Sequence, residues 1–154
     1  MTCEIRAARL LGLPAVMGAR VLGRVEKAVP EASGKALKGL LIRRGLGSAR
    51  WISRESVGVL GDVSVVVRRT PVRPPRDPAR ALSVVKDEGG LTLGRVTDMW
   101  LDPESFAITA LEITLGPLED LRCGRLCVRH WTVQPGDDGI PQVLLNRSEW
   151  EVQQ

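Results

Sequence analysis

Three side chains that could ligate a metal lie close together near the end of the chain. Cys123, Cys127 and His130 follow the spacing Cys-x3-Cys-x2-His. Thiolates and imidazoles bind zinc, but a structural zinc site needs four ligands that converge at about 2.0–2.3 Å. Only Cys3 remains as a fourth thiol, and on one strand His130 would face away from both neighbouring cysteines. We therefore interpret the cysteines as ordinary buried thiols and predict no metal site.

A catalytic role for the same group would pair the Cys127 thiol with His130, the single histidine of the chain. Arg125 and Arg129 are near Cys127 in the sequence and would favour its nucleophilic thiolate form. A cysteine enzyme also needs donors for the developing oxyanion, and no motif of that kind accompanies these residues. We expect no enzymatic activity, no cofactor and no small-molecule substrate.

Two further patterns have an ordinary structural interpretation. Paired carboxylates at 119–120 and 137–138 lie among glycines and prolines, which is typical of solvated turns. Residues 45–48 are rich in glycine but lack the lysine and the following helix of a phosphate-binding loop. Neither pattern predicts a site.

The stronger signal is a set of arginines at the ends of neighbouring predicted strands and in a proline-rich segment. The set comprises Arg43, Arg44, Arg50, Arg54, Arg68, Arg69, Arg73 and Arg76. Together with Trp51 they could form one basic binding face that contacts phosphates. A single tryptophan offers little stacking surface for single-stranded nucleic acid. We therefore favour a solvated face, or one paired with the acidic second half of the chain, over a nucleic-acid site.

The net charge of +4 conceals an asymmetry between the two halves of the chain. Residues 1–69 carry thirteen Lys/Arg and five Asp/Glu, a net charge of +8. Residues 81–154 carry six and twelve, a net charge of −6. The split predicts either different partners for the halves or attraction between them, within one chain or between chains.

A duplicated framework must position these residues. The motif Leu-Gly-Arg-Val at 22–25 occurs again at 93–96, which is 71 residues later. Two copies indicate tandem domains rather than a solenoid, which needs three or more short repeats. Glycine inside a strand marks a bend or a close backbone approach, so we interpret Gly23 and Gly94 as corners of small β-barrels.

Alternating hydrophobicity between glycine and proline breaks predicts short strands throughout the chain. In the first half they cover 15–29, 37–43, 50–57 and 63–67. In the second half they cover 82–86, 91–101, 108–115, 126–133 and 142–145. Strands at these intervals predict a small barrel or sandwich in each half. Residues 70–80 contain four prolines and no hydrophobic pattern, which predicts an extended linker.

The composition, 44% hydrophobic and 26% charged, is that of a folded globular protein. No apolar run approaches the ~20 residues of a membrane span, and the N-terminus lacks the apolar core of a signal peptide. Three cysteines without a regular framework indicate reduced thiols and a cytoplasmic protein. Aromatic residues are few, so we interpret Trp100, Trp131 and Trp150 as core or inter-domain packing, with a protein-binding hot spot as the alternative.

Several short motifs together carry a family resemblance. They are LGLPAV at 11–16, LGRV at 22–25, KGLLIRRG at 38–45, LGRVTD at 93–98 and LDPES at 101–105. Through them each half resembles a PRC-barrel domain, the small β-barrel of the cytoplasmic part of the photosynthetic reaction-centre H subunit. Each half is also similar to the C-terminal domain of the ribosome-maturation factor. The resemblance implies assembly or adaptor roles and carries over no catalytic residue.

The sequence therefore predicts an all-β protein of two tandem PRC-barrel-like domains, at 1–69 and 81–154, joined by the Pro-rich linker at 70–80. We expect a non-enzymatic adaptor that binds a protein partner or associates with itself. The alternative is association with RNA or the ribosome through the basic first half.

Overall fold

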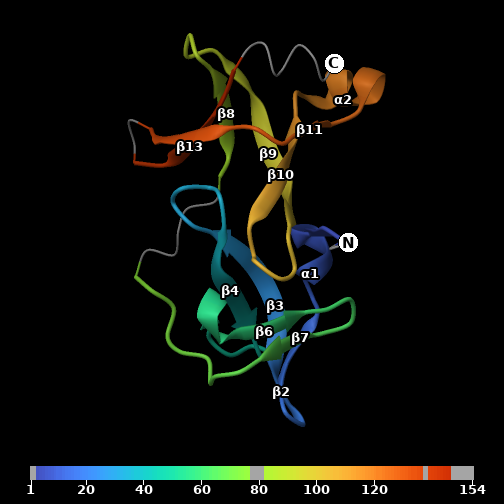
Figure 1. Cartoon of the computed structure of the whole chain (residues 1–154), viewed down its shortest axis with the longest axis vertical. Coiled ribbons are helices and arrows are strands. Elements are labelled where there is room, and N and C mark those ends of the chain that lie inside the picture. Colours follow the sequence, from blue (N-terminus) through green and yellow to red (C-terminus); the bar gives the residue numbers. More distant parts are fainter. Residues whose placement is uncertain (1–2, 77–81, 137–138, 147–154) are drawn as a thin grey trace.

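The computed structural model describes residues 3–76, 82–136 and 139–146. The chain forms two separate β-sheets, one in the lower half and one in the upper half of the view in Figure 1. The predicted all-β fold class is confirmed. Neither α-helix in the described part of the chain has the length and apolar character needed to cross a membrane.

The first sheet has the strand order β5-β4-β3-β2-β7-β6. Its strands are β2 (Pro14–Met17), β3 (Arg20–Pro30), β4 (Leu37–Arg43), β5 (Arg50–Ser53), β6 (Val57–Leu60) and β7 (Val65–Val67). The neighbouring strands are antiparallel except β2 and β7, which are parallel. A 3₁₀ turn, η1 (Arg54–Ser56), joins β5 to β6. Within the described residues no ladder joins these two edge strands, so the sheet is open rather than a closed barrel.

The second sheet repeats this plan with the order β11-β10-β9-β8-β13-β12. Its strands are β8 (Val84–Asp87), β9 (Thr92–Leu101), β10 (Ile108–Thr114), β11 (Leu126–Val128), β12 (Thr132–Pro135) and β13 (Pro141–Leu145). The single parallel pair among them, β8 and β13, matches β2 and β7. Three elements have no counterpart in the first sheet: β1 (Ile5–Arg6), which pairs with β9, and the helices α1 (Ala7–Leu10) and α2 (Pro117–Cys123).

The duplication extends to the strand register. Val25 lies opposite Ile42 in the first sheet, and Val96 lies opposite Ile113 in the second, with both members displaced by 71 residues. In each sheet the register then shifts by one residue at the next position of the long strand. Bulges twist and bend a strand, and both long strands carry this irregularity at equivalent places.

The repeated glycine has a steric cause in both copies. A Cβ on Gly23 would lie 2.8 Å from the carbonyl oxygen of Arg43, and a Cβ on Gly94 would lie 2.1 Å from that of Thr114. Arg43 and Thr114 are themselves 71 residues apart, at the ends of β4 and β10. The backbones therefore approach more closely than any side chain allows, as the glycines predicted.

The two sheets pack against each other through equivalent backbone groups. The Leu37 N–H donates to the Phe106 carbonyl at 2.8 Å, and the Ile108 N–H donates to the Lys35 carbonyl at 2.9 Å. Moving the donor Leu37 forward by 71 positions and the acceptor Phe106 back by 71 positions yields the second bond. Such a reciprocal exchange is the signature of an isologous contact, here related by an approximate two-fold axis.

The centre of this contact is the antiparallel bridge between Ala36 and Ala107. Beside it, the Lys35 ammonium lies 4.1 Å from the centroid of the Trp131 ring and also donates to the Trp131 carbonyl. The Trp131 Nε1–H donates to the Gly34 carbonyl at 3.3 Å. Buried residues of both sheets form one continuous hydrophobic cluster, in which Trp131 is 5% exposed. The prediction that Trp131 packs in the core or between the halves is confirmed, whereas Trp150 lies outside the described residues.

Several predicted strands are divided in the structure. The segment predicted at 15–29 is a hairpin with a turn at 18–19, between β2 and β3. The segments predicted at 50–57 and 126–133 each end early, at Ser53 and Val128. Of the predicted linker, Val72 exchanges two hydrogen bonds with Trp51, so this part lies along β5. Residues 77–80 lie outside the described residues.

Candidate interaction surface

Four arginines line two adjoining grooves at the edge of the first sheet. One groove, of about 450 Å³, is bordered by residues 20–22, 70–71 and the connection between β4 and β5. The other, also of about 450 Å³, is bordered by 48–50 and 73–74. The two share Ser48 and Arg50. We call the combined surface the arginine groove, and its arginines are Arg20, Arg44, Arg50 and Arg73.

A tight turn shapes one wall of the arginine groove. The Gly47 N–H donates to the Arg44 carbonyl at 3.0 Å, and Gly45 adopts a left-handed φ of 57° that favours glycine. The Arg43 guanidinium donates to the Gly47 carbonyl at 2.7 Å and fixes the far side of the turn. As a result Leu46 is held at the tip, fully exposed.

The opposite wall is positioned by the bridge between Trp51 and Val72. Their reciprocal N–H···O hydrogen bonds measure 2.8 and 2.9 Å. In antiparallel pairing the residues next to such a bridge lie opposite each other, so Arg50 on β5 faces Arg73 of the proline-rich segment. Both side chains line the same groove.

The positive charge of the arginine groove is not neutralised by the described part of the chain. No carboxylate lines either groove, and none of the described acidic residues forms an ion pair with its four arginines. Two carboxylates of the first half form ion pairs with arginines outside the groove lining: Glu26 pairs with Arg43 at 3.0 Å, and Glu31 pairs with Arg54 at 3.4 Å. The groove is therefore an exposed positive surface.

Exposed aliphatic side chains border the groove. Val21 lies in its lining, and Leu46 and Val72 lie beside lining residues. Val21 and Val72 are each 55% exposed, in addition to the exposed Leu46. Val72 pairs with Trp51, so alternation turns its side chain to the face opposite Arg73. Isolated exposed aliphatics are common, but Val21 and Leu46 at one positively charged groove form a mixed apolar and cationic surface.

The structure distributes the arginines of the predicted basic face over several places. Arg44 and Arg50 line the groove, Arg43 borders it, and Arg54 is engaged by glutamates. Arg68 and Arg69 are exposed directly after β7 but line neither groove.

Trp51 and Arg20 depart from the predicted arrangement. Trp51 is 7% exposed and packs on Gly39, where a Cβ would lie 2.4 Å from the indole ring. Its ring is therefore not available for stacking on a base. Arg20 lines the groove because the turn at 18–19 reverses the chain. The sequence signal for this turn was the glycine at position 18, which has a φ of 61° in the structure.

The cysteines are exposed, and the prediction that they are buried is wrong. Cys127 lies on the edge strand β11 between buried Leu126 and Val128, so alternation turns its thiol to solvent. Cys123 ends α2 and His130 follows β11, so they do not share one strand. In the described residues no group of three or more His, Cys, Asp or Glu side chains could hold a metal ion.

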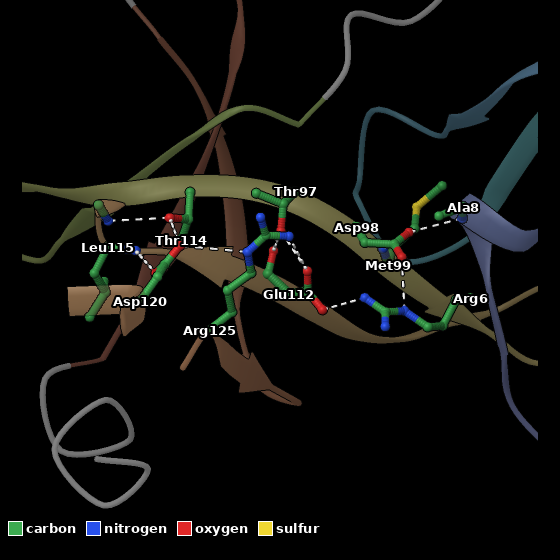
Figure 2. Close-up of polar contacts among 11 residues, drawn as sticks. Arg6, Ala8, Thr97, Asp98, Met99, Glu112, Thr114, Leu115, Asp120 and Arg125 are labelled. Atoms are coloured by element: carbon green, nitrogen blue, oxygen red, sulfur yellow. Dashed lines mark hydrogen bonds and ion pairs between the residues drawn. The ribbon is translucent and has the colours of Figure 1, made fainter. Parts of the chain in front are cut away.

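A buried carboxylate organises the polar face of the second sheet (Figure 2). Glu112 on β10 is 8% exposed and lies between two arginines. It accepts hydrogen bonds from Arg6, from Arg125 at 3.0 Å and from the Thr97 hydroxyl at 2.9 Å. The Arg6 Nε also donates to Asp98 at 3.0 Å. These contacts hold the N-terminal β1 on the second sheet.

The two carboxylate pairs noted in the sequence differ in what the structure shows of them. Asp120 is not a solvated turn residue: it accepts from the Thr114 hydroxyl and from the Leu115 N–H at 3.3 Å, and it lies 3.5 Å from Arg125. Its neighbour Glu119 is exposed, as predicted. The pair at 137–138 lies outside the described residues.

Acidification should weaken the Glu112 contacts. Burial raises the pKa of Glu112, but hydrogen bonds from Arg125 and Thr97 and the charge of Arg6 outweigh it, so the pKa lies below the usual 4.5. A depressed folded-state pKa contributes stability above the unfolded value, and that stability is lost as pH falls through the folded pKa. We expect Glu112→Gln to unfold at a lower temperature than wild type at about pH 7, and the difference to shrink towards about pH 3.

Thermal unfolding followed by circular dichroism across this pH range provides the test. Glu88→Gln, which removes an exposed carboxylate, is the matched control and should leave the pH profile unchanged. A constant difference between Glu112→Gln and wild type at every pH would contradict the role of the charged form.

An apolar cavity between the sheets is smaller than a usual ligand site. It is lined by α1, β3 and β9, including Leu11, Ala28 and Met99, and its volume is about 230 Å³. Small-molecule sites typically measure ~300–1,000 Å³. The arginine groove is therefore the stronger candidate surface.

In comparisons with known proteins, no family model matches the chain, and no curated protein is significantly similar to it. The function proposed below therefore rests on the geometry of the structure.

Proposed function

We propose that this protein is a non-enzymatic adaptor built from two PRC-barrel-like domains that binds protein partners. The repeated strand order supports two copies of one domain, and the two sheets, which share six equivalent strands and equivalent bulges, are compatible with an open form of a small barrel. The isologous contact joins the copies into one body. A pair of domains joined in this way is suited to holding two partners in a defined arrangement.

The observation that carries the proposal is the divergence of one connection. Between β4 and β5 the chain makes the tight turn that exposes Leu46. At the equivalent place, between β10 and β11, it forms α2, in which no residue is buried. Leu118 and Leu121, three residues apart on α2, are 71% and 85% exposed. The two copies therefore expose different aliphatic surfaces, one beside arginines and one on a helix.

These surfaces suit different protein partners. Exposed leucines at i and i+3 lie on one face of a helix, which fits an apolar patch of another protein. The arginine groove adds charge selection, which favours acidic partners and excludes basic ones. We therefore assign one partner to each half of the adaptor.

Co-purification of the tagged chain from its native cells tests this function. We expect discrete proteins to survive nuclease treatment with the wild type. Arg44→Gln/Arg50→Gln should lose one subset of them and Leu118→Ser/Leu121→Ser another, because the variants alter different surfaces. Mutation of interface centres typically reduces affinity by about tenfold or more.

Matched controls use exposed residues outside both surfaces. Arg9→Gln/Arg95→Gln and Leu91→Ser should retain all partners. Loss of the same proteins in both test variants would contradict two separate surfaces. Recovery of ribosomal material that nuclease removes would replace the adaptor with the RNA-binding alternative.

A further inference from the structure

The arginine groove contains an unfavourable arrangement of charge. The bridge between Trp51 and Val72 sets Arg50 opposite Arg73, and both side chains line one groove. Like charges directly opposite each other on neighbouring strands are destabilising. A fold that keeps such a pair exposed leaves a site where a bound anion is stabilising.

A second cross-strand arginine pair shows how the chain compensates such an arrangement internally. Arg24 lies opposite Arg43 in the ladder between β3 and β4. Arg43 forms an ion pair with Glu26 at 3.0 Å, and Arg24 donates to the Gly12 carbonyl at 2.9 Å. Among the described residues Arg50 and Arg73 have no equivalent acceptors. Their counter-charge is therefore expected from a partner.

The border of the groove identifies the class of anion. Single-stranded nucleic acid gains much of its affinity by stacking on aromatic rings, but Trp51, which follows Arg50 in the chain, is buried. A small inorganic anion would gain nothing from the exposed Val21 and Leu46. A peptide with both carboxylates and aliphatic side chains matches the whole surface.

We propose that the arginine groove binds an acidic segment of a partner protein, flanked by aliphatic residues. The carboxylates of the segment accept paired hydrogen bonds from the guanidinium groups of Arg50 and Arg73. The flanking aliphatic residues contact Val21 in the lining and Leu46 beside it. This inference rests on the proposed adaptor function, because it defines the partner of one of the two surfaces.

Fluorescence anisotropy with a synthetic peptide tests the proposal on the full-length chain. The probe is a fluorescein-labelled run of glutamates flanked by leucines. We expect Arg50→Gln/Arg73→Gln to weaken its binding by about tenfold or more, since two charge-assisted interactions are lost. The matched variant Arg9→Gln/Arg95→Gln should bind as wild type does. Leu46→Ser, and a probe with serine in place of leucine, should each weaken binding several-fold.

A stability measurement separates a binding role from a structural one. If the two arginines serve to bind an external anion, the variant Arg50→Gln/Arg73→Gln loses the repulsion between them. The melting temperature of this variant without peptide is then equal to or above that of the wild type. A lower melting temperature would indicate that the arginines support the fold. Equal peptide affinity of both double variants, or tighter binding of a single-stranded oligonucleotide, would overturn the proposal.

The peptide experiment can fail while the adaptor function still holds. If the peptide does not bind but the intact chain still captures proteins in the presence of nuclease, this inference is wrong and the adaptor function stands. If the chain captures no protein, the adaptor function itself is wrong.

Discussion

Gly94→Ala should destabilise the protein by about 3 kcal/mol, because the added methyl group would overlap the backbone of the neighbouring strand. Its Cβ would lie 2.1 Å from the Thr114 carbonyl oxygen and 3.1 Å from the carbonyl carbon. A backbone obstacle cannot rotate away, so β9 and β10 must separate. For a chain of this length we expect the melting temperature to fall by roughly 10 °C. Thermal unfolding followed by circular dichroism measures the change.

The equivalent glycine offers an internal comparison. Gly23→Ala places the Cβ 2.8 Å from the Arg43 carbonyl oxygen, a longer distance than at Gly94, but Gly23 also has a φ of 156° that side chains rarely adopt, so this variant should be destabilised as well. Gly89→Ala, with no atom nearer than 3.4 Å, is the control and should change stability by less than about 0.5 kcal/mol. Equal stability of Gly94→Ala and Gly89→Ala would show that the strands tolerate the methyl group.

Trp131→Ala should destabilise the protein by about 3–5 kcal/mol, the usual cost of deleting a buried aromatic side chain. The substitution also removes the ring that faces the Lys35 ammonium and the donor to the Gly34 carbonyl. We therefore expect the contact between the sheets to loosen more than the sheets themselves. Denaturant unfolding gives the total free energy. Amide exchange at Leu37 and Ile108, whose N–H groups cross the contact, reports the local effect.

Trp131→Phe separates packing from hydrogen bonding. It keeps most of the ring but lacks the Nε1–H, so we expect a cost of about 1–2 kcal/mol. If Trp131→Ala lowered stability while Leu37 and Ile108 kept their full relative protection, Trp131 would be a core residue of the second sheet without a role in joining the two.

The elements that the sequence predicted well are those governed by local pattern. The return strand at 37–43 has the predicted bounds, and the strand at 108–115 ends one residue early. Both are rich in apolar residues and are followed by glycine or proline breaks, at Gly45 and at Gly116-Pro117. The hairpin turn at 18–19 was missed because aliphatic residues on both sides continue the alternation across Gly18.

The helix α2 was missed because it buries no residue, and so has no apolar stripe facing the core. Only its terminal signals were available: a proline at its first position, followed by Glu119 and Asp120 in the first turn. The two acidic residues were interpreted as a turn instead. An exposed helix is weakly encoded when its apolar side chains face solvent.

The candidate surface was predicted in part for a similar reason. The arginines could be recognised in the sequence, but their convergence depends on the bridge between Trp51 and Val72, which are 21 positions apart. Val72 lies in a proline-rich segment whose hydrophobicity has no period, so no local pattern predicted the bridge. The docking of β1 onto β9 links residues more than ninety positions apart. Such contacts follow from tertiary packing, which local pattern does not encode.

The reciprocal bonds around Ala36 and Ala107 have a consequence for how the two copies can change. When identical chains assemble about a two-fold axis, every substitution appears on both sides of the assembly, and dilution can separate the chains. Here both partners belong to one polypeptide, so the local concentration of one copy around the other is set by the connecting chain and does not depend on the concentration of the protein in the cell. Each copy can then acquire its own loops while the central bridge is retained, as the glycine turn in one copy and α2 in the other illustrate. Duplication thus converts a symmetric pair into a body with two distinguishable ends.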